Sequence, residues 1–157
     1  MLTESDYLWI VNGLNFPEYN FRMRANGTVK EIFDTVRGRW VIITPEEWVR
    51  QHVIAWLREA KHYPGSLMAV EKQIKVNGLL RRCDVVCHNT AMQPLVIVEC
   101  KSPDVAITQE LFDQAARYNL TVGAKYFLLT NGLRHFCCTM DHENQQWTFL
   151  QDLPEWE

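Results

Sequence analysis

The segment LVIVECKSP, residues 95–103, constrains the fold most strongly. Its first four residues are apolar without alternation, which is typical of a strand buried on both faces in the centre of a sheet. Ser102 and Pro103 end this strand, because proline removes a backbone donor and restricts the residue before it. Glu99 and Lys101 are two residues apart, so their side chains leave the same face of the strand. A buried strand thus ends on an acid and a base, at the carboxyl end where α/β sheets bind ligands.

Length and charge limit what the chain can be. With 157 residues it fits one domain with a sizeable core, and we predict a single domain over residues 1–157. A net charge of −3 argues against a protein that coats nucleic acid by bulk electrostatics. It still allows an enzyme that contacts nucleic acid locally.

The cysteines and the length of the apolar runs indicate the cellular compartment of the protein. Five cysteines without a CxxC pair are typical of reduced thiols in a cytoplasmic protein, and the Cys and His spacings match no standard zinc site. The longest apolar run is far shorter than the roughly 20 residues of a membrane span. The N-terminal MLTESDYLWIVNGLNF lacks the pattern of a signal peptide. We therefore expect a cytoplasmic protein that has no membrane partner.

Turn residues and hydrophobic periodicity divide the rest of the chain into strands and two helices. The predicted elements are strands 20–27 and 29–43 around Asn26-Gly27, with a second turn at residues 37–39; a helix from the Thr44 N-cap and Pro45 to about Lys61; strands 67–76 and 79–88 around Asn77-Gly78; strand 94–101; helix 107–119; strand 125–130, ended by Asn131-Gly132; and a strand pair within 135–150.

The order of these elements predicts an α/β fold. A helix separates strand 94–101 from strand 125–130, which favours a right-handed βαβ crossover between two parallel strands. The other strands form hairpins, which are antiparallel. Together they predict a mixed central β-sheet that is flanked by helices on both faces.

A second acid completes a candidate site. Asp84, in RRCDVVCH, leads into an apolar strand, where a lone carboxylate is unfavourable. If its strand neighbours strand 94–101, Asp84 and Glu99 converge and can chelate a hard divalent cation. Mg²⁺ (or Mn²⁺) fits two carboxylates, a backbone carbonyl such as that of Cys100, and retained waters. Lys101 then lies beside a metal-bound water and a phosphoryl oxygen.

The strand context carries this interpretation. Glu59-Ala60-Lys61 has the same E-x-K pattern, but it lies on a predicted helix, where residues two apart point in nearly opposite directions. We assign no chemistry to that copy.

Asp84, followed after fourteen residues by Glu99-Cys100-Lys101, resembles the PD-(D/E)xK nuclease superfamily. This superfamily includes restriction endonucleases, recombination exonucleases and the nuclease domains of type I restriction motor subunits. Cys83 stands where the motif has proline. The resemblance implies a restriction-endonuclease-like core and metal-dependent cleavage of DNA.

The helix after Lys101 adds to the resemblance. Gln114 and Tyr118 are similar to the QxxxY motif that type I restriction subunits carry on this helix, and four residues apart they share one face. The resemblance implies that Gln114 positions the phosphate and that Tyr118 contacts DNA. The alternative is that Leu111, Ala115 and Tyr118 form a core stripe that Gln114 only borders.

The first helix offers two acids, Glu46 and Glu47. In the superfamily an acid on the first core helix often completes the metal site. Glu46 falls on the stripe formed by Val49 and Val53, whereas Glu47 lies off it and closes a capping box with Thr44, so Glu46 is the predicted metal-site acid. The alternative is that both acids only stabilise the helix N-terminus.

The resemblance extends over about residues 30–132. TPEEWVRQ, VIVECKSPDV, QAARYN and TNG follow in the order seen in stand-alone proteins similar to the type I restriction N-terminal domain. An N-terminal β-hairpin and a C-terminal β tail flank this predicted core.

Other polar residues are ambiguous. Arg81 and Arg82 either contact DNA phosphates or only begin their strand. Glu71 is either a further acid of the site or an exposed residue. We expect His52 and His62 on the surface.

The predicted function is a Mg²⁺-dependent deoxyribonuclease. A catalytically silent nuclease-fold module that binds DNA or a protein partner is the alternative, and a nuclease acting on RNA is the third hypothesis. The chain has no GxxxxGK[ST] phosphate loop, so a motor or a specificity subunit would have to be a partner protein. A homodimer, in which two sites cut two strands, is a further predicted arrangement.

Overall fold

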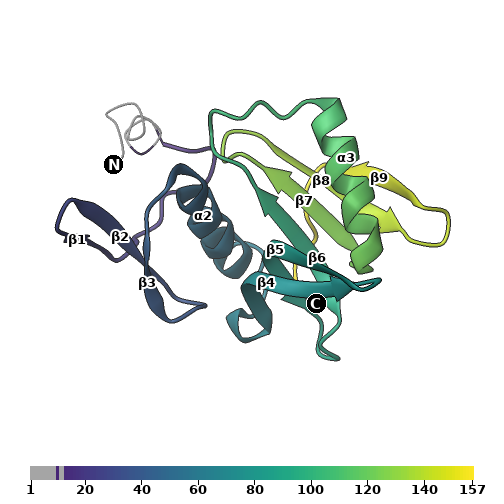
Figure 1. Cartoon of the computed structure of the whole chain (residues 1–157), viewed down its shortest axis with the longest axis horizontal. Helices are drawn as coiled ribbons and strands as arrows, with labels where there is room; N and C mark the ends of the chain where they lie inside the picture. Colours follow the sequence, from purple (N-terminus) through teal and green to yellow (C-terminus); the bar gives the residue numbers. More distant parts are fainter. Residues whose placement is uncertain (1–9, 11–12) are drawn as a thin grey trace.

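A computed structural model describes residue 10 and residues 13–157, so the prediction about a signal peptide lies largely outside the described residues. Within these described residues there are two sheets and two longer helices (Figure 1). The small sheet consists of β1 (Met23–Asn26), β2 (Val29–Asp34) and β3 (Arg39–Ile42). The large sheet has the order β4 (Met68–Val76), β5 (Leu79–His88), β6 (Pro94–Cys100), β7 (Tyr126–Thr130), β8 (His135–Asp141) and β9 (Gln146–Leu150). The helices are α2 (Pro45–Glu59) and α3 (Gln109–Asn119), with short 3₁₀ helices η2 (Gly65–Leu67) and η3 (Leu120–Val122).

The large sheet is mixed, as predicted. Strands β6 and β7 are parallel and are joined through α3, while every other neighbouring pair is antiparallel. Strand β6 lies between β5 and β7, which confirms that LVIVECKSP contains a central strand.

The helices cover opposite faces of this sheet. Helix α2 and the first face form one core, which includes Val49, Val53, Leu57, Val85, Val98 and Leu128. Helix α3 and the second face form another, which includes Phe112, Ala116, Val86, Ile97 and Phe127. Both cores use β5 and β6, which explains why these strands are apolar on both faces.

The predicted turns are present. Asn77 and Gly78 have φ of 50° and 82°, the positive values that a two-residue hairpin turn requires. Gly27 (φ 65°) connects β1 to β2, and β1 is shorter than the predicted strand 20–27. Glu71 also has a positive φ, 53°, which is uncommon for a residue with a side chain. It lies between the pairs Val70–Val85 and Lys72–Cys83, opposite Asp84.

Helix α2 begins as the sequence indicates, but its capping box is only half formed. The Thr44 hydroxyl accepts the N–H of Glu47 at 3.0 Å, and Pro45 is the first helical residue. The Glu47 carboxylate does not serve the cap. It accepts hydrogen bonds from Arg37 and Arg50 instead, because the side chain is buried beside them.

The small sheet packs against α2 on the side away from the large sheet (Figure 1). Ile32 and Ile43 form a core with Trp48 of α2. Helix α2 is therefore buried on two sides. The prediction of a surface His52 is wrong for this reason: its ring is buried against Phe21 and Trp48, and its Nδ1 lies 2.8 Å from the Trp48 carbonyl oxygen.

All five cysteines are free and buried, which agrees with the predicted reduced thiols. Over residue 10 and residues 13–157, none of the helices has the length and apolar character needed to cross a membrane.

Candidate functional site

Asp84 of β5 reaches the end of β6. Its Oδ2 atom accepts the backbone N–H of Cys100 at 2.8 Å, and its Oδ1 atom accepts a hydrogen bond from Arg50 Nη2 at 2.9 Å. Lys101 follows immediately, and its backbone N–H donates to the Thr130 carbonyl of β7 at 2.8 Å. The structure thus brings the Asp84 carboxylate to the backbone of Cys100, the residue between Glu99 and Lys101.

Glu99 lies on the α3 side of the sheet end. Its neighbours Val98 and Cys100 belong to the core under α2, whereas Ile97, on the same face as Glu99, belongs to the core under α3. Burial raises the pKa of Glu99; the positive charge of Lys101 lowers it, and the negative charge of Asp84 raises it further. The net effect is a raised pKa, which means that the surroundings of Glu99 disfavour its charged form.

Glu46, at the start of α2, interacts with the same groups. Its side chain is about half exposed. Partial burial and the negative charge of Asp84 raise its pKa, and the positive charges of Arg50 and Lys101 act in the opposite direction. Glu46 therefore lies within electrostatic range of both Asp84 and Lys101, while its neighbour Glu47 is buried among arginines.

The donor set suits a hard cation. In the described part of the chain no group of three or more His, Cys, Asp or Glu side chains is arranged to hold a metal ion. Mg²⁺ does not require one, because it commonly takes one or two carboxylates and keeps several waters. Asp84 raises the pKa of both Glu46 and Glu99, and this repulsion between carboxylates is what a divalent cation would relieve. The oxygen donors at this edge fit Mg²⁺.

Two arginines, the buried Arg50 and the partly buried Arg37, contact the acids, and the sequence prediction missed both. The Nη1 atom of Arg50 lies 2.9 Å from Glu47 Oε2 and 3.5 Å from Glu71 Oε1. Its Nη2 atom lies 2.9 Å from Asp84 Oδ1 and 3.6 Å from Glu46 Oε1. Burial lowers the pKa of Arg50, but Glu47 and Asp84 outweigh this effect and raise it. Arg50 is thus a fixed positive charge beside Asp84.

Arg37 extends the same network to the small sheet. Its Nε donates to Asp34 at 2.6 Å, its Nη2 to Glu47 at 2.5 Å and its Nη1 to Glu71 at 3.0 Å. Glu71 also pairs with Arg82 at 2.8 Å. The left-handed backbone of Glu71 places one carboxylate within reach of three guanidinium groups. Glu71 is therefore part of the network around Asp84.

Helix α3 supplies a further polar residue. Gln114 is exposed, and Tyr118 is 52% exposed with its ring against the Arg81 guanidinium. The side chain of Asn119, the last residue of α3, lowers the pKa of Glu99 by hydrogen bonding. The sequence prediction did not single out Asn119, although it directly follows Tyr118 in QAARYN.

The two arginines before Asp84 have different environments. Arg81 is 4% exposed and donates to the Tyr118 carbonyl and to Thr121, so it anchors the end of α3 inside the fold. Arg82 has a side chain that is 63% exposed and pairs with Glu71. Of the two, Arg82 is the one placed to meet a ligand from solvent.

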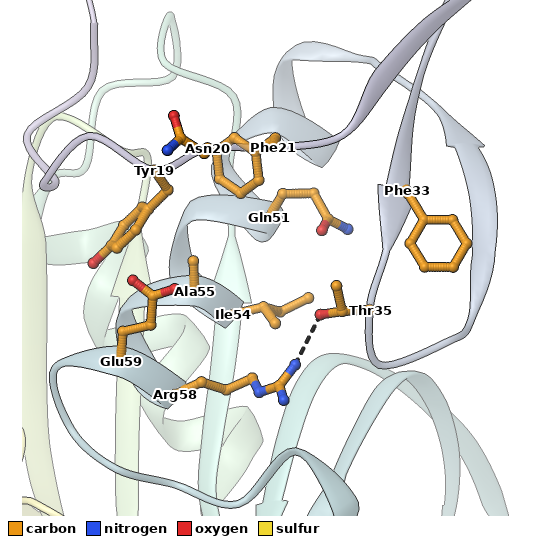
Figure 2. A pocket seen from close by; sticks show the side chains of 10 residues that line it. All are labelled: Tyr19, Asn20, Phe21, Phe33, Thr35, Gln51, Ile54, Ala55, Arg58 and Glu59. Carbon is orange, nitrogen blue, oxygen red and sulfur yellow. Dashed lines mark hydrogen bonds between the residues drawn. The ribbon is translucent and has the colours of Figure 1, made fainter.

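A cavity of about 360 Å³ lies between α2, β2 and the segment before β1 (Figure 2). Its walls come from the segment before β1, from β2 and from α2, and its lining comprises Tyr19, Asn20, Phe21, Phe33, Thr35, Gln51, Ile54, Ala55, Arg58 and Glu59. The Arg58 side chain donates to Thr35 at 2.9 Å across it. Gln51 lines the cavity and also donates to Asp34 and Glu47, which connects the cavity wall to the arginine network.

Comparison with known proteins bears on this site. A family model described as "Type I restriction enzyme R protein N terminus (HSDR_N)" matches residues 45–154. A solved fragment assigned as an HsdR subunit of a type I restriction enzyme from Vibrio vulnificus YJ016 is similar to this chain, with a TM-score of 0.50 and 20% sequence identity. The similarity covers 72% of this chain and 24% of that one, so it shows a shared fold over about a quarter of the larger protein. No curated protein matches.

Proposed function

The chain belongs to the type I restriction enzyme R protein N-terminus family, and from this membership we propose that it is a Mg²⁺-dependent deoxyribonuclease that hydrolyses phosphodiester bonds of DNA. The observation that supports the proposal is the hydrogen bond from the Cys100 N–H to Asp84, which joins β5 to the end of β6 between Glu99 and Lys101. Carboxylates beside a lysine at the carboxyl end of a central strand suit phosphoryl chemistry.

Each residue has a role in this proposal. Asp84, Glu99 and the Cys100 carbonyl would hold the cation, with Glu46 as an additional ligand; the bound cation would supply Lewis acidity and a more acidic water. Lys101 orients or deprotonates the attacking water and stabilises charge on the phosphoryl oxygen. Gln114 would position the phosphate, and Tyr118 and Arg82 would contact the DNA backbone. Because Arg81 is buried, its proposed contribution is to hold Tyr118 in place.

The proposed partners are DNA and other proteins. These 157 residues contain no phosphate loop of the GxxxxGK[ST] type, so ATP-driven movement along DNA would need a motor outside this sequence. A partner that supplies specificity, or a second copy that supplies a second active site, fits the same proposal.

One observation favours a second candidate function. Both Asp84 oxygens already have partners, Arg50 and the Cys100 N–H. A nuclease-fold module that binds DNA or protein without cutting would keep such an arrangement unchanged. The two functions are separated by an assay of metal-dependent cleavage.

Purified protein is expected to cut supercoiled and linear DNA in Mg²⁺ or Mn²⁺ and to stop when EDTA removes the metal. The measurement is the appearance of nicked, linear and shortened products on a gel. An RNA of matched sequence, incubated in parallel, tests the preference for DNA. Intact DNA in both metals would leave the silent module as the function.

Acidification is expected to weaken metal binding at a higher pH than ordinary carboxylates would require. The pKa of Glu99 is raised, so its carboxyl takes up a proton above the usual glutamate value of about 4.3. Binding of Mn²⁺, followed by electron paramagnetic resonance, should therefore begin to fall at a pH above the one at which an ordinary glutamate side chain is protonated. Lys101, Asp84, Asn119 and Arg81 are the groups that act on this titration.

The sign of this effect separates ligand loss from unfolding. A raised carboxyl pKa means that the folded chain binds the proton more tightly than the unfolded chain, so protonating Glu99 does not destabilise the fold. The circular dichroism spectrum should stay unchanged over the same range. Glu99→Gln should weaken Mn²⁺ binding and remove most of its pH dependence, whereas Glu143→Gln, at an exposed site, should leave both unchanged. Mn²⁺ binding that is constant down to about pH 4.5 would contradict the assignment.

A further inference from the structure

The Arg50 guanidinium divides its contacts between two pairs of acids. Its Nη1 atom faces Glu47 and Glu71, which belong to the buried network. Its Nη2 atom faces Asp84 at 2.9 Å and Glu46 at 3.6 Å. These last two carboxylates are proposed metal ligands. One side of the guanidinium is therefore anchored in the protein, and the other occupies the position from which a cation would approach Asp84.

The anchored side keeps Arg50 in place whatever happens at Asp84. The Arg50 side chain is only 7% exposed, and both Glu47 and Glu71 are also bound by Arg37. The Nε atom of Arg50 is buried and has no hydrogen-bond partner among the described residues. The charge of Arg50 is thus retained beside Asp84 by its Nη1 contacts, and it does not leave for solvent when the Nη2 contacts are lost.

We propose that Arg50 competes with the divalent cation for Asp84, and thereby sets the metal affinity of the site. This inference rests on the proposed function. The Oδ2 atom of Asp84 is held by the Cys100 N–H, so Oδ1 is the atom that a cation would share with Arg50. Two positive groups at one carboxylate repel each other strongly in a partly buried site. Arg50 is a positioning residue that acts through Asp84.

The chain contains a matched control for this effect. Arg37 is a second guanidinium of the same network, with a side chain that is 10% exposed, and it contacts Glu47 and Glu71 as Arg50 does. Its remaining partner is Asp34, whereas the remaining partners of Arg50 are Asp84 and Glu46. Replacing either arginine removes one positive charge from the network and takes one guanidinium partner from Glu47 and from Glu71. Competition for Asp84 applies to Arg50 alone.

The test is Mn²⁺ affinity, measured by electron paramagnetic resonance without DNA, for the parent, Arg50→Gln and Arg37→Gln. Glutamine removes the charge and keeps an amide donor. We expect Arg50→Gln to bind Mn²⁺ at least about tenfold more tightly than the parent, and Arg37→Gln to change the affinity by less than about threefold. A role of Arg50 that is only structural predicts weaker binding in both variants. Unchanged or weaker binding in Arg50→Gln, or equal gains in both variants, would overturn the proposal.

A measurement on the unmodified chain keeps the proposal falsifiable if Arg50→Gln does not fold. In ¹⁵N nuclear magnetic resonance, Mg²⁺ titration should shift the Arg50 Nε–H signal and the Cys100 amide with one common midpoint. The Cys100 N–H reports on Asp84 because it donates to this carboxylate. A Cys100 shift without an Arg50 shift would refute competition.

The outcomes also separate this inference from the proposed function. Tighter Mn²⁺ binding in Arg50→Gln without cleavage by the parent would refute the nuclease and retain the competition. Cleavage of DNA by the parent without tighter Mn²⁺ binding in Arg50→Gln would refute the competition and retain the nuclease. Absence of Mn²⁺ binding in both proteins would refute the two together.

Discussion

Lys101→Ala should lower the rate of Mg²⁺-dependent DNA cleavage by about 100-fold to 1,000-fold, the usual cost of removing one group that stabilises the transition state. The Lys101 charge acts on both Glu99 and Glu46, so the side chain lies at the centre of the proposed site. Its backbone N–H is bonded to the Thr130 carbonyl of β7, and alanine keeps that bond. The variant is therefore expected to fold normally. Initial rates of plasmid nicking, together with circular dichroism, provide the measurement.

The chain supplies its own control for this variant. Lys61 belongs to the second E-x-K sequence, Glu59-Ala60-Lys61, which lies at the end of α2 and not on a strand. It pairs with Asp152, far along the chain from the proposed catalytic residues. Lys61→Ala should cut DNA as fast as the parent. If Lys101→Ala also cuts at the parent rate, Lys101 has no catalytic role.

Asp34→Ala is expected to lower the free energy of unfolding by about 3–5 kcal/mol, because it removes one partner of a buried ion pair. Asp34 is fully buried. It accepts the N–H groups of Val36 and Arg37 at 2.8 and 2.7 Å, and the side chains of Arg37 and Gln51 at 2.6 and 2.9 Å. Alanine leaves these donors without their acceptor inside the protein. Urea unfolding followed by Trp fluorescence measures the loss.

The pH dependence of this loss has a defined sign. Burial alone would raise the pKa of Asp34, but the hydrogen bonds and the charge of Arg37 outweigh it and lower the pKa. The stabilisation is therefore complete above the unfolded value of about 3.9 and disappears as the pH falls through the lower folded value. Glu143→Ala, at an exposed site, should change the stability by less than about 0.5 kcal/mol. A similarly small effect for Asp34→Ala at neutral pH would show that the network contributes little.

Much of the fold followed from local chemistry in the sequence. Asn77-Gly78 predicts its hairpin because both residues adopt positive φ readily, and the structure has both. The unbroken apolar run before Glu99 predicts a central strand because only a strand covered on both faces buries such a run. Asp84 stands out because a carboxylate inside an apolar strand needs a partner, and it has two.

The arginine network could not be predicted in the same way. The stripe of Val49 and Val53 defines one buried face of α2, and helical periodicity then assigns Glu47, Arg50 and His52 to the outer side. These three residues are buried because the small sheet covers that side as well. Charged residues there look like an ordinary solvated face in the sequence, because a pattern along one helix carries no information about a second layer that packs on it.

The end of α3 was hard to predict for a related reason. Gln114 and Tyr118 share a helix face and match a motif, so the sequence predicts a functional role for both. In the structure both side chains are exposed. The Asn119 side chain hydrogen-bonds to Glu99, and Arg81 donates to the Tyr118 carbonyl and to the Asn119 side chain in the last turn of the helix. Their partners are distant in the sequence, and only the packing of α3 on β5 and β6 brings them together.

The contacts of Arg37 with the acids of the site limit where the N-terminus of this domain can be truncated. The family match begins at residue 45, and every proposed catalytic residue lies within it. A fragment that begins at residue 45 would contain these residues but would lack Asp34 and Arg37. Glu47 and Glu71 would each lose one guanidinium partner, Arg37. The acids beside Asp84 would then rely on Arg50 and Arg82 alone. The unit that carries the site therefore starts before β2, earlier than the region that sequence comparison detects.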